Sequence, residues 1–280
     1  MSLLTFTHFS RSMPGCTQVN VILPVGMEYE DLIEPGVKFQ TLWLTHGYGS
    51  NWTEWARLTC IEKLAMDHKF AVVMPDAANS FYCDQPDGRK YYTYITEELP
   101  AFLRKYLPLS DKREDNFIAG FSMGGYGAAK IGFHHPEKYA AVGILSFGPR
   151  DMVRDYREET DPDRLRRYKY TFGRVEDMPD SVNDLYQAFV RMRDSKAPMP
   201  LIYSACGTED HVYAGFDEFR RFLKAIGAEN DVIIEEGAGA HSWDFWDEYI
   251  AKFVDLLPLK NRNFWRKWYD SQHGGNRKAL

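Results

Sequence analysis

Short apolar runs alternate with amphipathic stretches along most of this chain. The nearly continuous apolar runs lie at residues 39–45, 70–75, 116–119, 139–147, 201–205 and 232–235. Stretches with helical periodicity separate them, and in residues 97–106 one face carries Leu99, Phe102, Leu103 and Tyr106. Strands without polar alternation are buried on both faces, which is typical of parallel sheets covered by helices. The pattern therefore predicts an α/β fold with a mostly parallel central sheet flanked by helices.

The two ends of this pattern complete the predicted domain. Residues 17–24 alternate between apolar and polar side chains, which predicts an antiparallel strand at the edge of the sheet. Helices over residues 216–226 and 243–257 are expected after the last two strands. The sequence shows no internal repeat and no low-complexity linker. We therefore expect a single domain over residues 1–280.

Residues 150–198 interrupt the alternation between two predicted strands. Their first part, residues 150–169, is dense in charges of both signs, and the whole segment lacks strand signals. We expect a helical cap or lid over the site, because this position between strands accepts insertions. The alternative is a solvated helical excursion that has no role in the site.

The final segment, residues 258–280, interleaves basic and aromatic side chains. Such a composition can indicate nucleic-acid binding. In an acidic chain we expect instead a terminal helix that packs against the core or against a neighbouring subunit. No nucleic-acid partner is predicted.

Composition places the chain among ordinary globular proteins. Its 280 residues are 44% hydrophobic, enough for a full core without disulfides, and its net charge of −6 gives no indication of an anionic membrane as a partner. The four cysteines lack metal-ligand spacing, so we expect no metal site and reduced thiols that are buried or half-buried. Neither a signal peptide nor a run of about 18 apolar residues is found, which predicts a cytoplasmic protein.

The strongest chemical signal is the sequence Gly-Phe-Ser-Met-Gly at residues 120–124. It lies between the apolar run at 116–119 and a helix of small residues, which is the context of a G-x-S-x-G nucleophile elbow. The turn is so sharp that the backbone of Ser122 is strained, and only glycine is tolerated two positions before and after it. The structural alternative is a glycine-rich turn in which Ser122 caps the following helix.

A serine hydroxyl needs a base within hydrogen-bond reach, and the base needs an orienting acid. In hydrolases with a nucleophile elbow, the acid and then the histidine follow the serine along the chain. His241 lies in a loop of small residues after the last strand, with His211 as the competitor. The loop after residues 201–205 contains Glu209 and Asp210; Asp210 is favoured and Glu209 is the alternative.

The oxyanion and the substrate need further groups. One oxyanion donor is expected to be the backbone N–H of Met123, which follows the nucleophile. The other should come from the His-Gly-Tyr-Gly loop at residues 46–49, with Tyr48 favoured over Gly49. Three aromatic side chains are candidate walls of the substrate pocket, with ordinary packing as the alternative for each: Trp52, Tyr126 and Trp243.

Four short blocks, at residues 44–51, 120–125, 207–210 and 241–246, together resemble the esterase D branch of the α/β-hydrolases. The likeness is greatest to the tributyrin esterase type, and the His-x-Trp-x-x-Trp sequence that begins at His241 is its most specific mark. The branch also includes S-formylglutathione hydrolases and feruloyl and acetyl-xylan esterases. The resemblance implies an α/β-hydrolase fold, hydrolysis of short-chain acyl esters without a cofactor, and frequent homo-oligomers. The Ser-Gly-Leu-Thr-Cys block of the formylglutathione hydrolases is not found.

The sequence therefore predicts a serine carboxylesterase that acts on small-molecule esters through an acyl-enzyme. An acyltransferase of the same fold is one alternative, and a feruloyl or acetyl esterase acting on carbohydrate-linked esters is another. A non-catalytic binding module is disfavoured, because such proteins usually lose a member of the triad and Ser122, Asp210 and His241 are all present.

Overall fold

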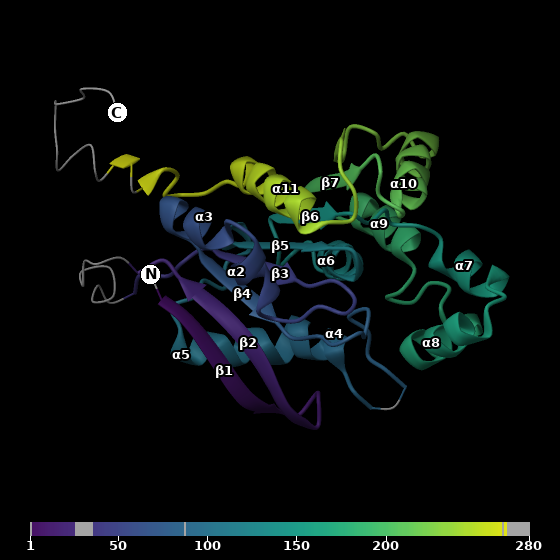
Figure 1. The fold of residues 1–280 in the computed structure, drawn as a ribbon, viewed down its shortest axis with the longest axis horizontal. Coiled ribbons are helices and arrows are strands. Elements are labelled where there is room, and N and C mark those ends of the chain that lie inside the picture. Colours follow the sequence, from purple (N-terminus) through teal and green to yellow (C-terminus); the bar gives the residue numbers. More distant parts are fainter. Residues whose placement is uncertain (1, 26–35, 87, 265, 268–280) are drawn as a thin grey trace.

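A single eight-stranded sheet organises the protein (Figure 1). The computed structural model describes residues 2–25, 36–86, 88–264 and 266–267. In spatial order the strands are β1 (Ser2–Ser10), β2 (Gly15–Leu23), β4 (Ala71–Pro75), β3 (Thr41–Thr45), β5 (Asn116–Phe121), β6 (Ala141–Leu145), β7 (Leu201–Gly207) and β8 (Ile233–Gly237). The pairs from β4 to β8 are all parallel, whereas β2 is antiparallel to both of its neighbours. The predicted mostly parallel α/β sheet is confirmed.

The prediction for residues 17–24 was right about an antiparallel strand and wrong about its place. β2 pairs with β4 on one side and, from Gly15 to Leu23, with β1 on the other. β1 is therefore the edge strand, and its side chains alternate between exposed and half-buried positions along most of its length. This alternation is typical of a strand with one face in water.

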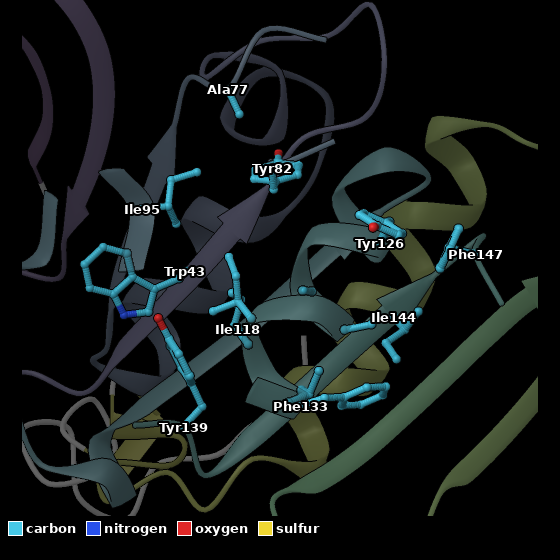
Figure 2. Close-up of a cluster of buried hydrophobic side chains, with 14 of the residues drawn as sticks. Trp43, Ala77, Tyr82, Ile95, Ile118, Tyr126, Phe133, Tyr139, Ile144 and Phe147 are labelled. Carbon is cyan, nitrogen blue, oxygen red and sulfur yellow. The ribbon is translucent and has the colours of Figure 1, made fainter. Parts of the chain in front are cut away.

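Both faces of the sheet are covered by helices. Successive side chains of a strand point to opposite faces, so Leu42 and Leu44 join one buried cluster whereas Trp43 joins the other. The cluster of Trp43, part of which Figure 2 shows, also contains Ile118 and residues of α5 (Leu99–Tyr106), α6 (Met123–His134), α9 (Leu185–Asp194) and α10 (Tyr213–Ala225). The opposite cluster includes residues of α2 (Glu54–Leu58), α3 (Ile61–His68) and α11 (Trp243–Leu256).

The helix predicted over residues 97–106 starts earlier than expected. The short helix α4 (Tyr91–Thr93) and a π-helical turn at Tyr94–Glu98 lead directly into α5. Leu99 and Leu103 are buried as the pattern suggested, but Tyr106 is 67% exposed because the last turn of α5 runs into solvent.

The segment 150–198 is built of helices, as expected. It contains α7 (Met152–Glu158), α8 (Pro162–Phe172), a 3-10 turn at Val175–Asp177, and α9. α9 packs on α6 and belongs to the layer that covers the sheet. In contrast, α7 and α8 stand beyond the sheet at the right-hand end of Figure 1.

Other expectations concern the thiols, the membrane and the tail. Cys83 and Cys206 are buried and Cys60 is half-buried, as expected, but Cys16 is exposed. No helix among the described residues is long and apolar enough to cross a membrane. The expected terminal helix within 258–280 lies largely outside the described residues, although Lys260 N–H donates to Gln40 Oε1 (2.8 Å).

Candidate active site

Ser122 occupies the sharp turn between β5 and α6. Its backbone has φ 54° and ψ −122°, a conformation that is strained for a residue with a side chain. A Cβ on Gly120 would overlap Thr45 Oγ1, and one on Gly124 would overlap the carbonyl oxygen of Thr45. The side chain of Ser122 makes no capping hydrogen bond to α6, contrary to the structural alternative. The turn thus holds a partly exposed hydroxyl at the N-terminus of a helix.

The turn after β7 brings a carboxylate to His241. Both carboxylate oxygens of Asp210 lie 2.9 Å from His241 Nδ1. Asp210 is 5% exposed, whereas the neighbouring Glu209 is exposed and the structure shows no such contact for it. A proton on Nδ1 is donated to the carboxylate, which leaves the lone pair of Nε2 to accept another proton. Of the two acids weighed from the sequence, the geometry pairs Asp210 with the histidine.

Backbone hydrogen bonds hold the acid loop and the histidine loop together. Thr208 N–H donates to the carbonyl of Gly237 (2.8 Å), and Glu209 N–H donates to that of Gly239 (3.0 Å). These contacts extend the parallel pairing of β7 and β8 beyond the ends of the strands. The loop that carries His241 is therefore positioned by the sheet and not only by its own residues.

Asp210 is held in its ionised form. Burial by itself would raise the pKa of Asp210, but hydrogen bonds from His241, from Val212 N–H (3.0 Å) and from the Ser146 hydroxyl together hold this pKa below its ordinary value of 3.8. Trp246 Nε1 in turn donates to Ser146 Oγ (2.9 Å). The carboxylate is thus charged at neutral pH, as an acid that orients a histidine must be.

Aromatic contacts connect the nucleophile's neighbour to the histidine. Phe121, next to Ser122, stacks on Trp246 with ring centroids 3.9 Å apart, and the Trp246 ring lies 5.0 Å from that of His241, edge to face. Among the described residues no hydrogen bond joins Ser122 Oγ to His241. Catalytic hydrogen bonds of this kind commonly tighten only when substrate binds.

Two backbone N–H groups near the elbow are available to an oxyanion. Met123 is the first residue of α6, so its N–H has no acceptor within the helix. Gly49 N–H donates to Asn79 Oδ1 (2.7 Å), whereas Tyr48 N–H finds no acceptor among the residues that the structure describes. Thr45 Oγ1 donates to the Gly124 carbonyl (2.7 Å), which holds this loop against the elbow. The geometry favours Tyr48 over Gly49 as the second donor.

The three candidate pocket walls have different surroundings. Tyr126 has no exposed surface and donates from its hydroxyl to Asn183 Oδ1 (3.1 Å), so it is a core residue and cannot line an open pocket in this structure. Trp243 is half-buried and packs edge to face on Trp55 and Phe121. Trp52 is partly exposed in the turn before α2.

A cavity of about 740 Å³ adjoins the site between α8 and the loops that carry Tyr48 and His211. Its aromatic walls are Tyr48, Phe81, Tyr168 and Tyr170. Phe81 connects the cavity to the elbow, because its N–H donates to Met123 Sδ (3.4 Å). Sequence reasoning missed Phe81, Tyr168 and Tyr170, since none belongs to a motif; only the expected cap indicated the region in which two of them lie.

One group of metal-ligand side chains overlaps the acid–histidine pair. Asp210, His211 and His241 offer ligand atoms within 4.8 Å of one another. His211 Nδ1 lies 3.5 Å from Asp210, and its side chain is 72% exposed. Because Asp210 already accepts from His241 Nδ1 and from Val212 N–H, we interpret the group as an acid–base pair with an exposed neighbour.

Comparisons with known proteins agree with this chemistry. The sequence model of the family described as "Putative esterase" matches residues 10–257. An acetyl esterase of Caldicellulosiruptor saccharolyticus is 32% identical over 274 residues, which cover 92% of this chain and 98% of the relative.

Solved structures of Staphylococcus aureus proteins share the fold. The fluorophosphonate-binding serine hydrolase F has a TM-score of 0.78 and 28% identity, over 91% of this chain and 98% of that one. The S-formylglutathione hydrolase FrmB has the same TM-score and coverage at 29% identity. With the strained serine, the acid–histidine pair and the sheet order, these likenesses settle the family. The chain belongs to the putative esterase family and is a carboxylesterase-type hydrolase of the α/β-hydrolase fold.

Proposed function

We propose that this protein hydrolyses short-chain acyl esters of small molecules, with Ser122 as nucleophile, His241 as general base and Asp210 as its orienting acid. The observation that carries the proposal is the pairing of both Asp210 oxygens with His241 Nδ1 at 2.9 Å. This pairing sets the tautomer that a general base requires. The strained, partly exposed Ser122 supplies the hydroxyl.

In the first half of the reaction, Ser122 Oγ attacks the acyl carbonyl while its proton passes to His241 Nε2. The N–H groups of Met123 and Tyr48 donate to the oxyanion of the tetrahedral intermediate. Collapse breaks the bond to the alcohol oxygen, which takes the proton from His241, and leaves the acyl group on Ser122. Water then repeats the sequence with His241 as base, releasing the carboxylic acid and restoring Ser122.

The relatives support a short acyl group. The curated relative at 32% identity is named for acetyl esters, and one of the similar structures is named for a formyl thioester. Packing on the α11 side of the elbow agrees, since Phe121, Trp243 and Trp246 fill this region with stacked and edge-to-face rings. We expect little room there for a long chain.

The test is the initial hydrolysis rate of p-nitrophenyl esters from acetate to octanoate, measured with wild type and Ser122→Ala. Wild type should turn over the short chains best, and the variant should lose about 10⁴–10⁶ in rate. A fluorophosphonate probe should label wild type and not the variant. Turnover by Ser122→Ala at the wild-type rate would contradict the proposed nucleophile, and equal rates with acetate and octanoate would contradict the short-chain preference.

A further inference from the structure

The cavity beside the site is lined by basic side chains in an acidic protein. Four arginines line it: Arg150, Arg164, Arg166 and Arg167. None of the described residues that line it is acidic, although the whole chain carries a net charge of −6. A cleft with charge of one sign focuses its field and concentrates ligands of the opposite sign.

Three of the four arginines pair with an acidic side chain outside the lining, and Arg150 does so with Asp155 (2.8 Å). Arg164 and Arg166 form salt bridges with Glu159 (3.3 Å) and Asp163 (2.9 Å), and both guanidinium groups are more than half exposed. The pair with Asp163 is exposed on both sides, and such pairs contribute little stability, so a ligand anion can compete for Arg166. The Glu159 side chain is only 11% exposed, but the Arg164 guanidinium keeps further N–H donors for a ligand anion. Arg167 is exposed and lies within salt-bridge distance of no acidic side chain among the described residues.

The cavity also borders two of the loops that surround Ser122. Tyr48, in the proposed oxyanion loop, and His211, in the acid loop, are both in its wall. Arg150 is close to the acid loop, since a Cβ placed on Gly215 in the first turn of α10 would lie 3.5 Å from Arg150 Cδ. The exposed rings of Tyr48 and Tyr170 add apolar surface to the lining of the cavity.

We propose that the preferred substrates are esters that carry an anionic group, a carboxylate or a phosphate, and that α8 binds this group through Arg164 and Arg167. The planar guanidinium fork matches the oxygens of both anions. The inference rests on the proposed function, and it assigns to the segment 150–198 a role in substrate selection.

The test compares kcat/KM for matched charged and neutral esters. Charge on the alcohol side is tested with 4-acetoxybenzoate and 4-acetoxyphenyl phosphate against methyl 4-acetoxybenzoate, and charge on the acyl side with p-nitrophenyl hydrogen glutarate against p-nitrophenyl butyrate. We expect wild type to favour the anionic member of at least one pair by about tenfold, mainly through KM, and this preference to shrink as salt is added. The benzoate and phosphate arms distinguish the two anions.

The double variant Arg164→Gln/Arg167→Gln should lose most of this preference while keeping its kcat/KM for p-nitrophenyl acetate within about twofold. Arg174→Gln is the matched control, because Arg174 is 71% exposed just beyond α8 and does not line the cavity. The charge reversal Arg167→Glu should lower kcat/KM for anionic esters further and raise kcat/KM for acetylcholine, which is cationic.

The outcomes separate this inference from the proposed function. Wild type that hydrolyses p-nitrophenyl acetate without any preference for anionic esters would overturn the inference alone. A preference that survives unchanged in the double variant would overturn the role of α8. Absence of Ser122-dependent turnover on every ester would instead overturn the proposed function.

Discussion

One side chain, Ser146, lies between Trp246 and the candidate catalytic acid Asp210. The Nε1 of Trp246 donates to Ser146 Oγ (2.9 Å), and the hydroxyl of Ser146, whose backbone is left-handed (φ 47°), helps to hold the pKa of Asp210 low. These buried contacts join α11 to the turns after β6 and β7. The helix that follows His241 therefore also helps to orient the acid.

Ser146→Ala should lower kcat about tenfold with little change in KM, because Asp210 loses one of the donors that orient it. It should also lower the free energy of unfolding by about 1–3 kcal/mol, since Trp246 Nε1 is left without an acceptor. Ser204→Ala is the control: Ser204 is buried on the adjacent β7, and its hydroxyl has no partner among the described residues. Equal effects of the two substitutions on kcat would contradict the positioning role of Ser146.

Asp210→Asn should reduce kcat/KM for short acyl esters by about 10²–10⁴, because the amide no longer sets the tautomer of His241 or stabilises its charge. Glu209→Gln should change kcat/KM by less than about twofold, since the Glu209 side chain is exposed and its contact with the histidine loop is made by the backbone. Steady-state kinetics of both variants at pH 7.5 provide the measurement. The reverse order of effects would make Glu209 the acid.

Gly124→Ala should disrupt the elbow. The new Cβ would overlap the carbonyl oxygen of Thr45 and lie 2.8 Å from that of His46, so the loop that presents Tyr48 must move. We expect a loss of about 1–3 kcal/mol in unfolding free energy and a large loss of activity. Gly15→Ala is the control, because its nearest contact would be an ordinary 3.8 Å, and it should be close to wild type in denaturant melts and in rate.

His134 should make the protein less stable in acid. Burial lowers the pKa of His134 from 6.5 to about 4, and its Nε2 has no partner among the described residues. Between these two values the unfolded chain binds a proton that the folded chain does not, so this contribution is complete above pH 6.5 and is lost as pH falls toward 4. Unfolding free energy should fall by roughly 1–2 kcal/mol more between pH 7 and pH 5 in wild type than in His134→Gln. Identical pH slopes in urea titrations would contradict this assignment.

Several features of the fold and site follow from local sequence. The apolar runs identify the parallel strands because a strand buried on both faces cannot carry polar side chains. The glycines around Ser122 identify the elbow because the crowding arises within a few residues of the turn. The edge position expected for β2 was wrong because the outer partner of β2 is β1, and the place of a strand in a sheet depends on which other strands pair with it.

The sequence by itself determined the class of the sheet, the strained serine and the loops in which its partners had to lie, since these depend on periodicity and on steric rules within a single turn. Only the tertiary structure decided which of two adjacent acids meets His241 and which of two adjacent N–H groups is free, because neighbouring residues in a turn point in different directions and packing alone selects between them. It also placed Tyr126 in the core and gathered the arginines of α8 into one cleft, because a run of mixed charges is sorted by sign only when the helix folds against its neighbours.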